Sequence, residues 1–331
     1  MPIPQSFLSG AAGVPFTDAV AINNYFTRQN GHDFISWFNE NIANKGFWGK
    51  SGNRAGVSIG NDRDKFNKLW STESIQTVFG HNSVSLLQFL ALQSIFNNET
   101  GGSLIPLTEK VGRPPLHPGI AYAFNKIPET KKRAYNTLSG NKTCFDLFND
   151  TNYNSRFQDL PLGQQLKNTT NLVWKGEAYP LTISTSINPA DTGYVLEADF
   201  YKFRGRGFIQ TTGRTNYSSI IDFVMKYTGK DDVIKNMKAT WAQRSTDNDI
   251  LATASTNEEW DTLFQNTSGL IALKSVEVHN RLSGDYLGKL NGSDPTKAES
   301  SIRNMGKGIS GGGPYVDIFL GRVTQIIELL Q

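Results

Sequence analysis

Two glutamates that lie close together in the sequence could supply acid–base chemistry. Glu99 follows an apolar run and precedes Gly101 and Gly102, and Glu109 stands ten positions later, after Pro106. A helix would fix the first carboxyl, the glycines would expose it, and a loop could fold the second carboxyl back over the same cleft. Such a pair is the minimum set for acid–base cleavage of a glycosidic bond. The alternative is two solvated surface charges.

A second polar segment, YKFRGRGFIQTTGRTNY at residues 201–217, could form a binding wall. Gly205 and Gly207 would let the main chain approach a ligand or a helix closely, and Ile209 would anchor the segment in the core. Side chains that both donate and accept hydrogen bonds would then face one side: Gln210, Thr212 and Asn216. Such groups suit the hydroxyl and acetamido groups of a sugar.

Other interpretations of this segment have less support. A nucleotide-binding turn would need a preceding apolar strand and a complete Gly-x-Gly-x-x-Gly pattern, and the sequence has neither. A nucleic-acid site would need a wide basic face, whereas the net charge is only +3. The remaining alternative is structural, with glycines in a tight connection and arginines on the surface.

The elements that would position these groups are mostly helices. Apolar periodicity predicts helices at 84–97, 217–227, 258–282 and 315–330, and weaker ones at 17–28 and 33–43. Strand signals are few, at 179–187 and 198–203. The sequence therefore predicts a mainly helical protein with a loop-rich insertion at about 112–199.

Aromatic residues divide into two predicted groups. Five tryptophans are expected in the core: Trp37, Trp48, Trp70, Trp241 and Trp260. Trp174 and Tyr179 lie in the polar insertion, where their faces could stack on sugar rings. We therefore expect the insertion to border the cleft and to contact sugars.

Composition excludes several classes of protein. Cys144 is the only cysteine, so no intrachain disulfide can form. The four histidines show no metal-ligand spacing, so no metal site or cofactor is expected. No segment reaches the roughly 18 apolar residues of a membrane span. The N-terminus does not resemble a signal peptide, which favours release by lysis or a dedicated export route over ordinary secretion and leaves a cytosolic location open.

Together, the two polar segments resemble glycoside hydrolase family 19, the plant-type chitinases and related bacterial and phage lysozymes. That family has a helix ending in His-Glu-(Thr/Ser)-Gly-Gly, which appears here as NETGG at residues 98–102. Its later segment, Tyr-(Arg/Lys)-Gly-Arg-Gly-x-Ile-Gln-Leu-Thr-Gly-Arg-x-Asn-Tyr, appears as FRGRGFIQTTGRTNY at residues 203–217. The alignable parts run from about Leu86 to Glu109 and from Phe203 to the C-terminus.

The resemblance implies a mainly α (α+β), lysozyme-like fold, in which a two-lobed helical domain has a central sugar-binding cleft. Residues 81–331 would form the catalytic domain, interrupted by the insertion at about 112–199. The resemblance does not account for residues 1–80, which we expect to be a helical extension that could dock the enzyme to a partner such as a phage or secretion apparatus.

The resemblance also implies roles for individual residues. Glu99 would be the general acid and Glu109 the base that activates water, at the short spacing typical of the lysozyme-type members. Thr212 would help to hold that water. The implied substrate-binding residues are Gln210, Asn216, Tyr217, Arg206, Asn98 and Ser310.

Departures from the family pattern surround the acid. Asn98 replaces the histidine before the glutamate, and Ser310 stands where asparagine is usual. Thr211 replaces a leucine and is expected to point into the core. Arg322 could be the family's late arginine, but it lies a few positions farther along.

The predicted function is an inverting glycoside hydrolase of β-1,4-linked N-acetylhexosamine polymers, acting at a cell wall. Peptidoglycan is favoured over chitin, because the spacing is lysozyme-like and no chitin-binding module is attached. Because Asn98 and Ser310 depart from the family pattern near the acid, a non-catalytic glycan-binding protein is an alternative. A structural or delivery component, in which residues 1–80 dock to a partner, is a further alternative that is compatible with catalysis. No nucleic-acid partner is expected.

Overall fold

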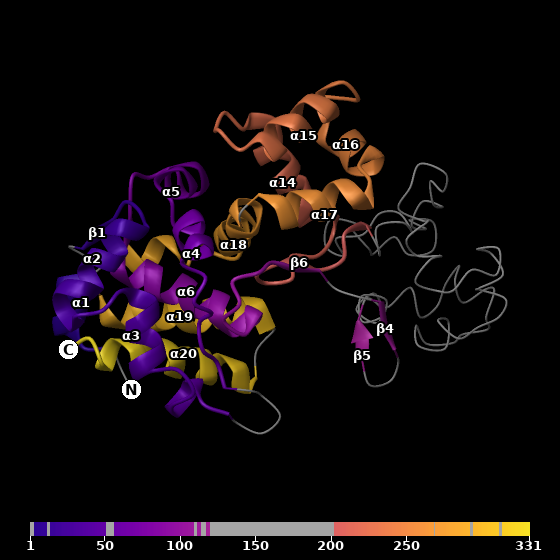
Figure 1. The fold of residues 1–331 in the computed structure, drawn as a ribbon. Coiled ribbons are helices and arrows are strands. Elements are labelled where there is room, and N and C mark those ends of the chain that lie inside the picture. Colours follow the sequence, from indigo (N-terminus) through magenta and orange to yellow (C-terminus); the bar gives the residue numbers. More distant parts are fainter. Residues whose placement is uncertain are drawn as a thin grey trace. The chain divides into compact units, whose positions relative to one another are not determined.

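The computed structural model describes residues 3–11, 14–50, 56–108, 111–113, 117–119, 202–267, 269–291, 294–310 and 313–331. Over these residues the protein is mainly helical with short strands, as predicted (Figure 1). The chain divides into two compact units. Unit 1 comprises Met1–Pro106, Gly207–Ile209 and Thr267–Gln331, and unit 2 comprises Leu107–Arg206 and Gln210–Asn266.

Unit 1 is a helical assembly with one short sheet. Its N-terminal elements are α1 (Gln5–Ala11), β1 (Pro15–Phe16), α2 (Ala19–Asn30), α3 (Phe34–Asn41), η1 (Gly46–Trp48), α4 (Arg63–Leu69), α5 (Thr72–Phe79), β2 (Val84–Ser85) and α6 (Leu86–Thr100). Its C-terminal elements are α18 (Leu270–Leu282), η3 (Gly288–Asn291), α19 (Pro295–Ser310) and α20 (Pro314–Glu328). The strands β1 and β2 pair antiparallel, with Pro15 opposite Ser85.

The core of unit 1 is built around α6. This helix begins at a capping box, in which the Ser85 and Gln88 side chains each accept from the other residue's backbone N–H. Residues 86–97 are all buried, because the helix is apolar on most of its surface. Aromatic rings surround Phe89 at centroid distances of 4.9–6.3 Å: Phe16, Phe26, Phe34, Phe66 and Trp70.

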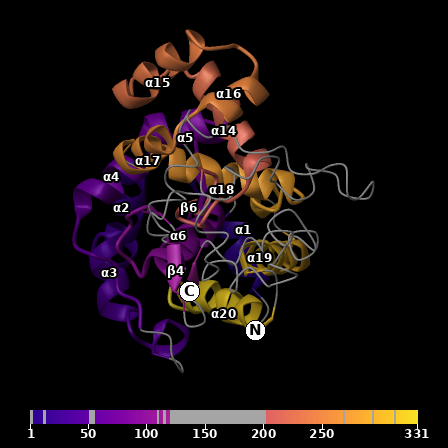
Figure 2. The same ribbon diagram turned by 90° about the vertical axis from the view of Figure 1, so that its right-hand side faces the viewer.

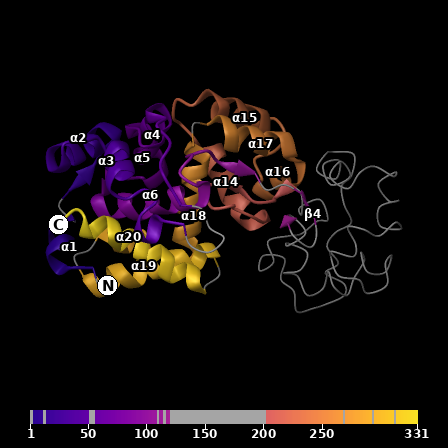
Figure 3. The same ribbon diagram turned by 60° about the horizontal axis from the view of Figure 1, so that its bottom comes forward.

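The C-terminal helices complete this core. Helix α20 packs against α6 and against α19, and Figure 3 shows the three helices side by side. The helical spacing of apolar residues that predicted a helix at 315–330 reflects this contact, since Phe319, Val323 and Ile327 are buried. Residues from both ends of the chain therefore enclose one central helix.

Unit 2 is a smaller helical group. Its described elements are β3 (Leu107–Thr108), β4 (Val111–Arg113), β5 (His117–Gly119), α14 (Arg214–Lys226), α15 (Asp232–Ala242), α16 (Asn248–Ala254) and α17 (Asn257–Asn266). The strands β4 and β5 pair antiparallel, and β3 pairs with β6 (Arg206–Gly207). Helix α14 contacts α15 and α16, and α15 contacts α17 (Figure 2). The Tyr217 and Trp260 rings meet in the interior at a centroid distance of 4.7 Å.

The predicted helix over 258–282 is wrong, because the structure has two helices there. Gly269, between α17 and α18, adopts φ +88°, a left-handed conformation that a helix interior does not allow. A Cβ at this position would also lie 3.2 Å from Leu69 Cδ1. The other predicted helices correspond to α2, α3, α6, α14 and α20.

The predicted core tryptophans are confirmed. The exposed fraction is 3% for Trp37 and 0% for Trp48, Trp70, Trp241 and Trp260. Trp174, Tyr179 and the strand predicted at 179–187 lie outside the described residues, as does almost all of the predicted insertion. Among the described residues, no helix combines the length and the apolar character needed to cross a membrane.

Candidate functional site

The C-terminal end of α6 is fixed by two glycines. Gly101 caps the helix at φ +60°, and its N–H donates to Asn97 O. Gly102, at φ +81°, crosses another stretch of backbone so closely that a Cβ would lie 1.8 Å from Ser58 O. The Gly60 N–H donates to Gly102 O at 3.0 Å. Only glycine fits at position 102, and the end of the helix is therefore held in one place.

The backbone that receives Gly102 is itself held by α3. Asn39 Nδ2 donates to Ile59 O at 2.8 Å, and the Ile59 N–H donates to Asn39 Oδ1 at 2.9 Å. A side-chain amide thus pairs with a main-chain amide as a strand would. Residues from the first part of the chain therefore support the segment that carries Glu99.

Glu99 lies half-buried at this helix end, with one carboxylate oxygen engaged. Oε1 accepts from Asn98 Nδ2 at 2.5 Å and from the Tyr315 hydroxyl. Asn98 Nδ2 also donates to the Tyr315 hydroxyl at 2.5 Å. Within the part of the chain that the structure describes, no hydrogen bond engages Oε2. The carboxyl is therefore oriented through one oxygen while the other stays available for proton transfer.

Arg322 stands behind Asn98. One of its terminal nitrogens donates to Asn98 Oδ1, and its Nε donates to Phe47 O at 2.9 Å. The guanidinium lies 4.8 Å from the centroid of the buried Trp48 ring, a cation–π arrangement. Because both ends of the Asn98 amide are bonded, this residue links a buried cation to the carboxyl of Glu99.

The spacing along α20 explains how two residues reach Glu99. Tyr315 and Arg322 are seven positions apart, about two helical turns, so they lie on the same face of α20. That face packs on α6. The sequence predicted Arg322 only as a late match to a family arginine and missed Tyr315, although this helical spacing was visible in it.

Three predicted wall residues form a hydrogen-bonded series in unit 2. Thr212 Oγ1 donates to Gln210 O at 2.6 Å, and Asn216 Nδ2 donates to Thr212 O at 2.8 Å. Gln210 Nε2 lies 3.4 Å from its acceptor, Leu107 O. All three are half-buried. The structure therefore brings together the side chains that the sequence grouped.

Gln210 has an unusual backbone conformation. Its φ is +53°, in the left-handed region that non-glycine residues seldom adopt. The surrounding hydrogen bonds hold it there: Thr212 bonds its carbonyl, and the flanking Arg206 and Thr211 exchange N–H to O bonds at 2.8 and 3.1 Å. Strained residues of this kind cluster at functional sites, so the conformation of Gln210 makes this turn a candidate for one.

Arg206 and Tyr217, predicted to bind substrate, are instead enclosed by unit 2. Both are fully buried. Arg206 donates to Asp261 Oδ1 at 2.7 Å, to Asn257 Oδ1 at 2.7 Å and to the Tyr217 hydroxyl at 3.0 Å. That hydroxyl donates to Arg204 O, and burial raises the Tyr217 pKa and keeps the phenol neutral. Both side chains are therefore bonded inside unit 2 and do not reach its surface.

One part of the structural alternative, that the arginines of this segment lie on the surface, is wrong. Exposed fractions are 4% for Arg204, 0% for Arg206 and 7% for Arg214. Arg204 and Arg206 both bond Asp261 and Asn257 on α17. A buried guanidinium needs such partners, because an unpaired charge in the interior is costly. Arg204 and Arg206 fasten the segment to α17.

Adjacent threonines at 211 and 212 face different surroundings. The Thr211 side chain is 7% exposed, in agreement with its predicted inward orientation. Its Oγ1 has no hydrogen-bond partner among the described residues. Thr212 is half-buried, and its hydroxyl is bonded. One threonine is therefore a packing residue and the other belongs to the polar series.

The remaining predicted residues are incompletely described. Glu109 lies outside the described residues. Ser310 is the last residue of α19, and its side chain is not described. Asn98 and Glu99 belong to unit 1, whereas Gln210, Thr212 and Asn216 belong to unit 2. The described candidate residues thus form two separate groups, one in each unit.

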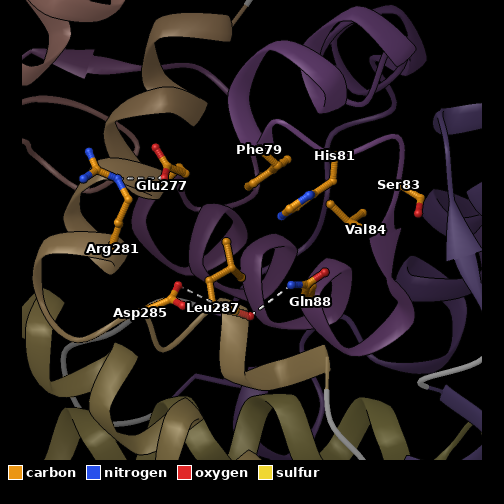
Figure 4. A pocket seen from close by; sticks show the side chains of 10 residues that line it. Phe79, His81, Ser83, Val84, Gln88, Glu277, Arg281, Asp285 and Leu287 are labelled. Carbon is orange, nitrogen blue, oxygen red and sulfur yellow. Dashed lines mark hydrogen bonds and ion pairs between the residues drawn. The ribbon is translucent and has the colours of Figure 1, made fainter.

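A separate polar pocket in unit 1 contains none of these residues (Figure 4). It has a volume of about 70 Å³ and is lined by residues that include Phe79, His81, Gln88, Glu277, Arg281 and Asp285. Gln88 Nε2 is committed to Leu287 O at 3.0 Å, and Glu277 bonds Lys274 and Arg281. Gln88, Glu277 and Arg281 are therefore already engaged with protein partners. Among the described residues, no group of histidine, cysteine and carboxylate side chains could hold a metal ion.

Comparisons with protein-family models, curated proteins and solved structures gave no match to this chain.

The buried arginine of unit 2 generates a stability prediction. Arg206→Met removes the donor shared by Asp261, Asn257 and Tyr217, so it should lower the free energy of unfolding by about 3 kcal/mol or more. Urea unfolding of the full chain measures this change. Lys226→Met is the control, because that side chain is 77% exposed in its pair with Asp222 and should cost less than about 1 kcal/mol. Equal effects of the two substitutions would refute the fastening role of Arg206.

Proposed function

We propose that this protein is a glycoside hydrolase that cleaves β-1,4-linked N-acetylhexosamine polymers with inversion. The observation that carries the proposal is the half-buried Glu99 carboxyl, with one oxygen held by Asn98 and Tyr315 and the other without a hydrogen bond in the described part of the chain. A general acid needs such a fixed, partly desolvated carboxyl. The lysozyme-like arrangement of two lobes around a central cleft is part of the same proposal.

In the proposed reaction, Glu99 Oε2 carries the proton. That proton passes to the glycosidic oxygen as its bond to the anomeric carbon breaks. A water molecule on the opposite face forms the new bond to that carbon and gives its proton to Glu109. Inverting enzymes keep the two carboxyls about 6.5–9.5 Å apart to leave room for this water. Thr212 would orient the water.

Two contacts favour the enzyme over a non-catalytic glycan-binding protein. Asn98 retains a hydrogen bond to Glu99 although it replaces the family's histidine, and Arg322 supports it from behind. Tyr315 adds a second donor to the same oxygen. The groups needed to orient an acid are therefore present around Glu99. A glycan-binding protein without turnover is the second candidate.

Peptidoglycan is the favoured polymer, and chitin is the alternative. Gln210 Oε1 and Asn216 Oδ1 bear no hydrogen bond among the described residues and would accept from sugar hydroxyl or acetamido groups. Both polymers present these groups. The preference for peptidoglycan rests on the lysozyme-like spacing of Glu99 and Glu109. Docking of residues 1–80 to a partner remains compatible with either substrate.

Substitution of the proposed acid gives the first functional prediction. Glu99→Gln should retain the fold and abolish hydrolysis, because an amide keeps an acceptor for Asn98 and Tyr315 but has no acidic proton to transfer. Incubation with purified peptidoglycan and, separately, with chitin oligomers, followed by mass spectrometry of the products, measures both the activity and the substrate.

Glu40→Gln is the matched control, because Glu40 is exposed and lies in the same unit. It should cleave as the unmodified protein does. Near-normal turnover by Glu99→Gln would show that another group is the acid. Products from neither polymer with the unmodified protein would contradict the proposed activity itself.

The neighbouring threonines provide a second functional prediction. Thr212→Val should lower turnover by about 100-fold, because a lost hydrogen bond to the reacting water costs a few kcal/mol of transition-state stabilisation. Thr211→Val should change turnover little and should not destabilise the protein, because it removes a buried hydroxyl without a described partner. Thr212→Ser should restore most of the rate.

Initial rates and urea unfolding of the three variants measure these effects. If Thr212→Val cleaves as fast as Thr211→Val, the polar series in unit 2 takes no part in the reaction.

A further inference from the structure

An aromatic ring stands exposed on unit 1, close to the support of Glu99. Phe47, in η1, has an exposed fraction of 53%. The other large apolar side chains exposed in the described part of the chain are aliphatic: Val20, Ile105, Leu107, Ile250, Leu282 and Leu329. Its neighbour Trp48 is completely buried. Single exposed apolar residues are common, so exposure alone would carry no argument.

The backbone of Phe47 is held unusually firmly for such an exposed residue. Its N–H donates to Gln325 Oε1 at 2.8 Å, and its carbonyl accepts from Arg322 Nε at 2.9 Å. Gln325 Nε2 also donates to Lys45 O at 3.2 Å. Trp48 Nε1 donates to Arg322 O at 3.1 Å. Side chains and backbone of α20 thus fix both sides of η1.

The ring itself rests on α20. A Cβ at Gly321 would lie 2.4–2.6 Å from Cε1, Cδ1 and Cζ of Phe47, so the ring can occupy this position only over a glycine. Part of the ring is therefore covered by main chain, and the rest faces solvent. A ring held in this way loses little rotational freedom when a ligand stacks on it.

Arg322, which holds the Phe47 backbone, is also connected to the proposed acid, Glu99. The Arg322 guanidinium bonds the Phe47 carbonyl on one side and the Asn98 amide on the other, and Asn98 bonds Glu99. The Phe47 carbonyl is thus connected to the Glu99 carboxyl through two side chains, the Arg322 guanidinium and the Asn98 amide. All of these residues belong to unit 1. The exposed ring and the Glu99 carboxyl are therefore held by one hydrogen-bonded network.

We propose that the exposed Phe47 ring is a stacking platform for an N-acetylhexosamine ring of the bound polymer. Aromatic faces suit the apolar faces of sugar rings. This inference rests on the proposed function, since it adds a subsite to the site around Glu99. It also gives residues 45–49 a role: they brace Arg322 and present the platform.

Binding to inactive protein tests the platform apart from catalysis. In the Glu99→Gln background, calorimetry with the β-1,4-linked N-acetylglucosamine hexamer should give roughly three- to tenfold weaker binding for Phe47→Ala. Phe47→Leu should weaken binding similarly, because leucine has no aromatic face to stack on a sugar. Leucine can still cover Gly321, so this variant isolates the effect of the ring. Phe47→Trp should retain binding.

Leu282→Ala is the control, because Leu282 is a similarly exposed residue of unit 1 at 54%. It should leave the Kd unchanged. With Glu99 intact, Phe47→Leu should raise KM more than it lowers kcat. If Phe47→Ala and Phe47→Leu bind the hexamer as Leu282→Ala does, the platform is refuted while the proposed hydrolase stands. If the hexamer binds none of the proteins and neither polymer is cleaved, the proposed function fails and the platform with it.

Discussion

The hydrogen bond from Arg322 to Asn98 is the contact on which the arrangement around Glu99 depends. A buried guanidinium must be surrounded by acceptors, because an uncompensated charge in the interior would cost several kcal/mol. Arg322 meets this requirement with the Phe47 carbonyl, the Asn98 amide and the Trp48 ring. Residues from the beginning, the middle and the end of unit 1 thereby meet beside one carboxyl.

Unit 2 solves a similar problem in the glycine- and arginine-rich segment. Its arginines do not face a ligand; Arg204 and Arg206 turn inward to Asp261 and Asn257 and hold the segment on α17. The polar side chains that remain toward the surface follow the left-handed turn at Gln210. Buried charge therefore supports this segment from within, and neutral amides and hydroxyls lie nearer the surface, where the proposed function requires them to contact a sugar.

Sequence periodicity predicted α2, α3, α6, α14 and α20 because their apolar residues are buried, as in α6 and α20, but it did not predict α15 or α19. It missed the break at Gly269, because the apolar pattern continues from α17 into α18. The left-handed backbone conformation of Gly269 that separates the two helices leaves no mark in that pattern. Residue types grouped Gln210, Thr212 and Asn216, which the structure joins by hydrogen bonds, and singled out Glu99 as a candidate that stays a prediction. They misplaced Arg206 and Tyr217, because a charged or phenolic side chain can bind a ligand or a buried partner. Tyr315 required knowledge of which face of α20 meets α6.

The configuration of the newly released sugar end tests the central claim most directly. Proton NMR of β-1,4-linked N-acetylglucosamine oligomers during the first turnovers by the unmodified protein distinguishes the two anomers before they interconvert. If Glu99 donates a proton while water attacks the opposite face, the first product is the α-anomer. A β-anomer as the first product would contradict the inverting mechanism. The absence of any cleaved product, with peptidoglycan fragments as well, would contradict the assignment of Glu99 as a glycosidase acid.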